Sequence, residues 1–563
     1  MSTTPEPGAD QAREQAGILS SSAVMAAGTA VSRLSGFVRS ALLIAALGSG
    51  LHADVFAIAN TVPNMLYILL AGGVFNAVLV PQLVRSQKQD ADGGEAYTNR
   101  IVTLAALFLG TVTVLLVVAA PWVMQLFLGG PWNDPGLAEQ RASAIDFARY
   151  CLPQVFFYGM FVLVGQILNA RGRFGPMMWA PIANNLVAIG VLATYLLVFG
   201  PARDEQLFGP FTPGQEALLG LGSTLGIVLQ LAVLVPYLAK AGFRYRPRFD
   251  LRGTGLGHTL RLGVWTVLFV VVNQIAYTVV VNLAGSGPAQ APESSSSTGY
   301  AVYSMSFLIV MVPHSIITVS LATAVLPRLS RLAADDDRRG LAESLTSTLR
   351  SALAVIVPFA LLLPLVARDA AHVIWGYGAG RDTYANFAPT LALFGIGLVF
   401  FTVHYLMLRG FYALEQTRTV FWVQCVIAAT NIAAALLLVR EATAEQTSPA
   451  LVLAYAASYL VGAGVSVTVL GRHLGGLGLR AVVRFVIRLL IVAALATAGA
   501  YAVAWLLSSL GEDPSLLVAL LRLGAVTAVD VVLFLLLARW WRLTEVTGVL
   551  NTVTQRFPGR SGA

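Results

Sequence analysis

The sequence predicts an all-α polytopic membrane protein with about 14 transmembrane helices. Three observations lead to this class: 57% of the 563 residues are hydrophobic, only 11% are charged, and the mean hydropathy is +0.74. A soluble protein carries about 25% charged residues, so this composition would leave large apolar patches in contact with water. It therefore excludes a soluble globular enzyme and indicates that lipid surrounds the chain.

Long apolar windows predict the number of helices, because a helix needs about 20 mainly apolar residues to cross a bilayer. Continuous runs such as 112–120 do not alternate between polar and apolar residues, which excludes a transmembrane barrel. Fourteen windows are long enough. Their approximate limits are 20–47, 54–84, 98–120, 143–170, 174–199, 216–239, 258–284, 300–327, 341–367, 384–408, 417–439, 449–470, 482–508 and 515–538.

Lys and Arg predict the orientation. With the N-terminus inside, the inner connectors carry 27 of these residues and the outer connectors carry 7. The positive-inside rule therefore places both termini in the cytoplasm. The formal net charge of +8 reflects this asymmetry and is suited to anionic lipid headgroups. It gives no support for a nucleic-acid partner.

Short internal matches predict two related halves, although such matches also arise by chance in apolar sequence. The second span ends with AVLVPQLVRS and the eighth with TAVLPRLSRL, which is an offset of six spans. An offset by an even number of spans keeps the two copies in the same orientation in the membrane. Such parallel repeats are typical of transporters. The expected divisions are a disordered cytosolic tail at 1–19 without a signal peptide, six-helix lobes at 20–240 and 258–470, helices 13 and 14 at 482–541, and a cytosolic tail at 542–563.

Catalytic motifs are missing from the sequence. It has no HExxH, GxSxG, P-loop, CxxC or metal-spaced His cluster, so we expect no catalytic residues, metal or cofactor. The glycine-rich segment 220–226 lies inside a span, which favours helix packing over nucleotide binding. The segment 335–339, DDDRR, favours a solvated charge run over the acidic pair of a glycosyltransferase.

Two arginines lie inside the first apolar window. Arg33 and Arg39 each cost about 2.5 to 3.5 kcal/mol at a helix centre. They are about 9 Å apart along the helix axis and about 120° apart around it, with Ser32 and Ser40 widening the polar side. A water-filled cavity fits this pattern.

Two interpretations of the arginines stay open. In the structural one, Asp54 or backbone carbonyls near Pro63 neutralise them. In the functional one, they leave a positive cavity for an anion. Phosphate matches best, because a guanidinium donates two parallel hydrogen bonds to phosphate oxygens, and a diphosphate would engage both arginines.

Other polar residues in the apolar windows favour structural roles. Asp530 has Arg522 or the arginines of the thirteenth span as candidate partners, and a structural contact is favoured over a proton relay. His314 and His404 are interpreted as hydrogen-bonded core residues.

Five segments resemble the opening of the MurJ (MviN) family: SRLSGFVR (32–39), GSGLHADVF (48–56), VPN (62–64), GGVF (72–75) and LVPQL (79–83). These proteins are lipid II flippases of the multidrug/oligosaccharidyl-lipid/polysaccharide (MOP) exporter superfamily. The resemblance implies a transporter, not an enzyme, that moves undecaprenyl-diphosphate-linked lipid II from the inner to the outer leaflet of the bacterial cytoplasmic membrane by alternating access. It also implies a basic cavity between two lobes and a lipid-tail groove at helices 13 and 14.

The resemblance carries over five substrate-binding positions. They are Ser32, Arg33, Arg39, Asp54 and Asn64. Charged positions of many relatives are neutral here, at Tyr67, Ile68, Gly72 and Leu308. Headgroup binding is therefore expected to depend more on the two arginines. Some relatives bind sodium through an aspartate of the seventh helix, but 258–284 contains no acid, so sodium coupling is not implied.

Three alternatives stay open. An exporter of another polyprenyl-diphosphate-linked oligosaccharide would use the same basic cavity. A cation-drug antiporter would need acidic cavity residues, and a polytopic glycosyltransferase would need a long loop outside the membrane. The partners implied are lipid II, membrane lipids and the cell-wall synthesis machinery, and the sequence leaves the oligomeric state open.

Overall fold

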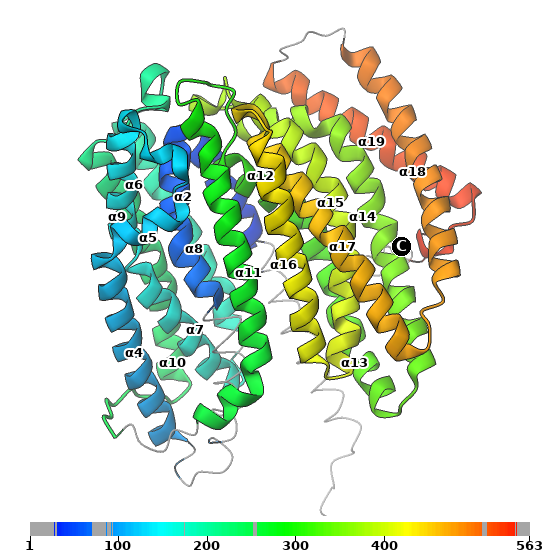
Figure 1. Cartoon of the computed structure of the whole chain (residues 1–563), viewed down its shortest axis with the longest axis horizontal. Coiled ribbons are helices and arrows are strands. Elements are labelled where there is room, and N and C mark those ends of the chain that lie inside the picture. The colour runs from blue at the N-terminus through cyan, green and yellow to red at the C-terminus, as the bar shows by residue number, and fades with distance from the viewer. Residues whose placement is uncertain are drawn as a thin grey trace, which may run out of the picture. The chain divides into compact units, whose positions relative to one another are not determined.

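The computed structural model describes residues 28, 31–69, 86, 92, 94–173, 175–250, 256–508, 515–546 and 548. Within these ranges the regular structure is entirely helical, which confirms the all-α class (Figure 1). A first helix covers 31–47. The helices after it are α2 (Leu51–Ile68), α4 (Glu95–Val118), α5 (Ala120–Phe127), α6 (Ala138–Cys151), α7 (Gln154–Ala170), α8 (Gly175–Val198), α9 (Pro213–Ala232), α10 (Leu234–Lys240), α11 (Leu256–Gln290), α12 (Tyr300–Pro313), α13 (Val319–Ala334), α14 (Arg338–Trp375), α15 (Phe387–Ala413), α16 (Thr417–Arg440), α17 (Thr447–Leu474), α18 (Leu479–Ser508) and α19 (Leu516–Trp540).

Twelve segments in the described part of the chain are long and apolar enough to cross a membrane, from Glu95–Val118 to Leu516–Trp540. They correspond to the third to fourteenth predicted windows. The windows 20–47 and 54–84 lie partly outside the described residues, so the total of fourteen remains a prediction. The predicted tail at 1–19 also lies outside them, as does most of the predicted tail at 542–563, of which only 542–546 and 548 are described.

Some helices extend beyond their apolar windows. The longest, α14, has 38 residues, although its window covers only 341–367. The Asp337 side chain accepts a hydrogen bond from the Gly340 N–H at 2.8 Å and caps its start. Arg338 and Arg339 pair with Asp336 and Glu343 on the exposed surface. The prediction of a solvated charge run at 335–339 is therefore confirmed.

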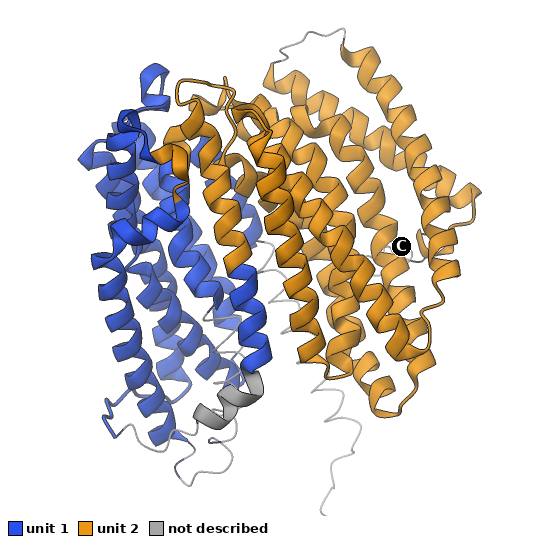
Figure 2. Cartoon of the chain, in the orientation of Figure 1, with its two compact units in different colours: residues 1–48, 55–127, 133–274 blue, residues 49–54, 128–132, 275–563 orange. Residues whose placement is uncertain are grey.

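The chain forms two compact units (Figure 2). Unit 1 comprises Met1–Gly48, Val55–Phe127 and Asn133–Gln274, and unit 2 comprises Ser49–Asp54, Leu128–Trp132 and Ile275–Ala563. The helix α2 begins in unit 2 and continues in unit 1, whereas α11 begins in unit 1 and ends in unit 2. The lobe limits expected from the internal matches remain a prediction.

Unit 1 has its core between α4, α7, α8 and α10. Ile101, Phe161 and Leu234 are buried there with their neighbours. In α9, Gly220 lies so close to Tyr150 that a Cβ would be 2.5 Å from the Cβ of that tyrosine. The glycines of 220–226 therefore allow close helix packing, as the sequence predicted.

In unit 2, the C-terminal helices α18 and α19 pack on α14. Leu362, Val366, Ala500 and Val526 form a buried cluster where the three helices meet. The two C-terminal helices are thus held to unit 2 by apolar packing.

Candidate substrate-binding site

The helix over 31–47 places both predicted arginines in unit 1. The Arg33 side chain is exposed and the Arg39 side chain is half-buried. Arg39 interacts electrostatically with Tyr158 of α7. The Tyr158 ring in turn lies 4.7 Å from the Tyr67 ring of α2, measured between centroids. Among the described residues, no carboxylate lies within 4.0 Å of the Arg39 guanidinium, so none of the described acids pairs with it.

The same helix is held to α8 through Asn185. The Asn185 Nδ2 donates to the Ser32 carbonyl at 3.0 Å and to the Ser35 Oγ at 2.9 Å. The Ser35 hydroxyl also donates to the Ser32 carbonyl. These contacts fix the start of the helix and therefore restrict where Arg33 and Arg39 can point.

A second polar contact links α2 to α7. The Gln154 Nε2 donates to the Asn60 Oδ1 at 3.1 Å. One turn further along α2, the predicted site residue Asn64 is exposed. Its side chain is therefore accessible to a ligand.

Asp54 lies in unit 2 and is fully buried. Its carboxylate accepts hydrogen bonds from the backbone N–H groups of Tyr300 at 2.8 Å and Ala301 at 2.7 Å. These groups belong to the first turn of α12, where a helix leaves N–H groups without intrahelical partners. A Cβ on the neighbouring Gly299 would overlap the Asp54 carboxylate, so only glycine fits beside this cap. Both oxygens of Asp54 are thus used within unit 2.

The polar residues of the later helices are also bonded within the protein. The Asp530 carboxylate accepts from the Thr497 hydroxyl at 2.9 Å, while Arg522 faces Asp369 at 3.6 Å. The structural role expected for Asp530 is confirmed, but the expected arginine partner was wrong. Asp530 lies about two turns from Arg522, where α18 offers a hydroxyl.

The two buried histidines have polar partners as well. His314 and His404 lie within hydrogen-bond distance of the Thr402 and Ser466 hydroxyls, at 3.3 Å and 2.8 Å. Both residues are buried in unit 2. The prediction that they are hydrogen-bonded core residues is confirmed.

Sequence reasoning missed several contributors to this region, notably Asn60, Gln154, Tyr158 and Asn185. Amides and a tyrosine within apolar helices are a usable signal, because lipid offers them no hydrogen bonds. Their partners lie 94 to 153 residues away in the chain. The sequence alone therefore gives no means of pairing them.

The fold is shared with solved membrane transporters. A solved structure titled "Lipid II flippase MurJ, inward closed conformation" superposes with a TM-score of 0.69 at 17% identity, covering 92% of this chain and 98% of that one. An inward-facing multidrug resistance MATE family transporter of the MOP superfamily superposes with a TM-score of 0.61 at 14% identity, covering 79% of this chain and 95% of that one. These likenesses define the fold.

The family follows from the sequence comparison. The family model for the lipid II flippase MurJ matches residues 43–521. The chain therefore belongs to the MurJ family of lipid II flippases. A probable lipid II flippase MurJ of Haemophilus influenzae is 27% identical over 408 residues, covering 69% of this chain and 75% of that protein. The lipid II flippase MurJ of Burkholderia cenocepacia is 27% identical over 400 residues, covering 69% and 72%. Family membership confirms the predictions of a membrane transporter rather than an enzyme.

Proposed function

We propose that this chain moves lipid II from the inner to the outer leaflet of the cytoplasmic membrane by alternating access, with Arg39 and Arg33 binding the diphosphate. The supporting observation is the environment of Arg39. A guanidinium on an apolar helix interacts electrostatically with a tyrosine, and no carboxylate among the described residues lies within 4.0 Å of it. Such a group favours an anionic ligand, and the ligand named by the family carries a diphosphate.

The transport step requires no covalent chemistry. The obstacle is the free energy of moving a charged sugar-diphosphate through hydrocarbon, where it loses its hydration. Two guanidinium groups would replace part of that hydration with charge-assisted hydrogen bonds. The polyprenyl tail remains in lipid, so only the headgroup needs a polar path.

The other predicted positions take different parts in this proposal. Ser32 is half-buried and Asn64 is exposed, and both would bind sugar or phosphate oxygens. Asp54 is fully buried and bonded to α12, and its carboxylate charge would repel a diphosphate. We therefore propose that Asp54 positions the start of α2.

The orientation and partners complete the proposal. Both termini lie in the cytoplasm, because the 27 to 7 distribution of Lys and Arg follows the positive-inside rule. Lipid II then enters from the cytoplasmic leaflet, where it is synthesised, and leaves towards the enzymes that polymerise it. The cell-wall synthesis machinery is the partner that this direction of transport supports.

The test is transport by the full-length protein in vesicles that contain labelled lipid II or another polyprenyl-diphosphate-linked oligosaccharide. Protein-free vesicles and vesicles with Arg39→Ala protein serve as controls. We expect lipid II, and not the second lipid, to reach the opposite leaflet in a protein-dependent way. Equal transport of both lipids would instead favour a general oligosaccharide exporter, and transport of neither would contradict the proposal.

A further inference from the structure

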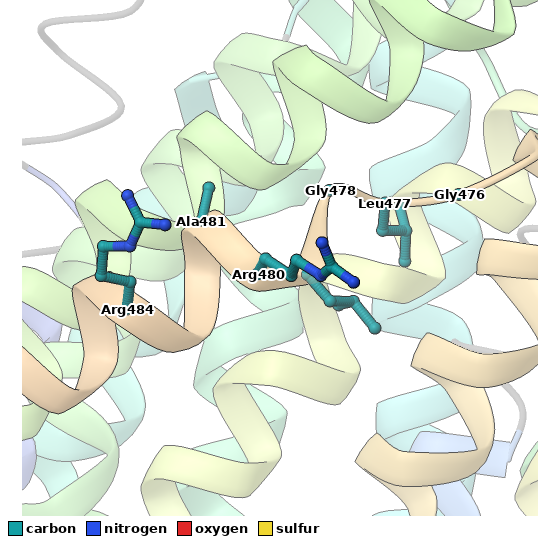
Figure 3. Close-up of a pocket in the computed structure, with 7 residues that line it drawn as sticks. Gly476, Leu477, Gly478, Arg480, Ala481 and Arg484 are labelled. Atoms are coloured by element: carbon teal, nitrogen blue, oxygen red, sulfur yellow. The ribbon is translucent and has the colours of Figure 1, made fainter.

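The linker between α17 and α18 forms a pocket in unit 2 with a volume of about 500 Å³ (Figure 3). Residues 476–481 and Arg484 line it. Three glycines at 475, 476 and 478 have φ values of 73°, 129° and 61°. Glycine adopts this left-handed region without strain, so the chain turns sharply from one helix into the next. The turn leaves the first residues of α18 exposed around the pocket.

Arginines follow one face of α18 from this pocket. Arg480, Arg484 and Arg488 are spaced by four residues, which places successive guanidinium groups one turn apart. The first turn of α18 carries no acidic residue. Arg488 donates to the Trp541 carbonyl. By contrast, Arg480 and Arg484 are exposed, and the described part of the chain provides neither with a carboxylate within 4.0 Å.

The end of α19 adds to this basic surface, because the Arg488 contact brings it alongside α18. Arg539 and Arg542 are both exposed there. Glu545 follows them in the chain, but its carboxylate pairs with Arg350 of α14 at 2.9 Å. The local charge is therefore strongly positive, and the acid within it is already paired.

An apolar stripe runs beside the arginines. Leu479, Val483 and Ile487 are 46%, 54% and 53% exposed, and each precedes an arginine by one residue. One residue is about 100° of rotation in an α-helix, so the two stripes lie on adjacent faces. Trp540 of α19 is 76% exposed, and tryptophan is enriched at the level of lipid headgroups.

We propose that the pocket binds the headgroup of an anionic phospholipid, with the phosphate held between Arg480 and Arg484. Two guanidinium groups one turn apart match the oxygens of a single phosphate. The acyl chains would then lie along the apolar stripe of the same membrane-spanning helix. The basic pocket and the apolar stripe are continuous, which favours a bilayer lipid over a soluble anion, because a soluble anion has no acyl chains to contact the stripe. The pocket belongs to unit 2, whereas Arg39 belongs to unit 1, and the proposed lipid binding does not depend on the transported substrate.

The experiment is native mass spectrometry of the full-length protein, titrated in neutral detergent with phosphatidylglycerol or phosphatidylcholine. The test variant is Arg480→Gln/Arg484→Gln. The matched control is Arg328→Gln/Arg339→Gln, which removes two exposed arginines from α13 and α14 of the same unit. Thermal unfolding of the lipid-free proteins checks that both variants fold.

We expect the wild type and the control to retain phosphatidylglycerol over phosphatidylcholine. The test variant should bind phosphatidylglycerol about thirtyfold more weakly (~2 kcal/mol, from about 1 kcal/mol per arginine). Equal retention of the two lipids by the wild type, or unchanged affinity in the test variant, would overturn the proposal. So would displacement of phosphatidylglycerol by stoichiometric farnesyl diphosphate, which would assign the pocket to polyprenyl diphosphates. Displacement by inorganic phosphate at equal concentration would assign it to a soluble anion.

Discussion

Two ionisable side chains in apolar helices have contrasting surroundings. Asp54 in unit 2 is fully buried, and its carboxylate accepts two backbone N–H groups of α12. Arg39 in unit 1 is half-buried beside Tyr158, with no carboxylate among the described residues to neutralise it. The first charge serves the fold because its hydrogen bonds are complete. The second retains binding capacity, so it is the better candidate for a ligand contact.

The largest expected effect on transport comes from removing Arg39. Arg39→Ala should insert normally but fail to support growth of cells depleted of their own flippase. A hydrogen bond to a charged group contributes about 1.5 to 3 kcal/mol, which corresponds to a tenfold or larger loss of transport. The control is Arg149→Ala, because Arg149 is an exposed arginine of unit 1 paired with Asp146. Full complementation by Arg39→Ala would remove the contrast with Asp54.

Removing Asp54 should affect stability before it affects binding. Asp54→Ala leaves the buried N–H groups of Tyr300 and Ala301 without acceptors, which costs about 2 to 4 kcal/mol of the free energy of unfolding. The thermal unfolding midpoint in detergent should therefore fall. Asp54→Asn retains one acceptor oxygen and should lower the midpoint less. Asp146→Ala is the exposed control. A wild-type midpoint for Asp54→Ala would show that the cap contributes nothing.

A smaller effect is expected at Asn185, which fixes the helix that carries Arg39. Asn185→Ala removes the bonds to the Ser32 carbonyl and the Ser35 hydroxyl and should cost about 1 kcal/mol. Transport of lipid II in vesicles should fall a few-fold, because the helix is less firmly held. Thr194→Ala on the same helix is the control, since Thr194 is exposed and its hydroxyl donates only to the Gly190 carbonyl one turn earlier in α8. If both variants transport equally well, Asn185 does not position the site.

The smallest effect belongs to the ion pairs of Asp250, an exposed residue outside the candidate spans. Arg248 and Arg100 donate to Asp250 and hold the pKa of this exposed carboxylate below its ordinary value of 3.8. The stabilisation is therefore complete above about pH 4 and is lost as the pH falls through the lowered pKa. Pepsin cleavage of segment 241–250 should rise at the acid end of the pH range in which pepsin is active. Asp250→Asn should abolish this pH dependence of cleavage without changing transport at neutral pH. Such exposed pairs contribute little, so a large loss of transport in Asp250→Asn would contradict the ranking.

The sequence predicts the spans well because lipid requires long apolar helices. The twelve described segments from Glu95–Val118 to Leu516–Trp540 follow this rule. It also identifies Arg39 and Asp54 as unusual. The destination of Asp54 could not be predicted, because Tyr300 lies 246 residues away and a backbone N–H has no sequence signature. The pairing of Asp530 with Thr497 was missed for a related reason, since charge complementarity does not identify a neutral hydroxyl partner.

The most direct test of the central claim is the affinity of the full-length protein for lipid II, measured by native mass spectrometry for the wild type, Arg39→Gln and Arg149→Gln. Gln keeps hydrogen-bonding capacity but removes the charge, so it isolates the role of the guanidinium. The account predicts at least tenfold weaker binding for Arg39→Gln and wild-type binding for Arg149→Gln. Equal affinity of all three proteins for lipid II would contradict it.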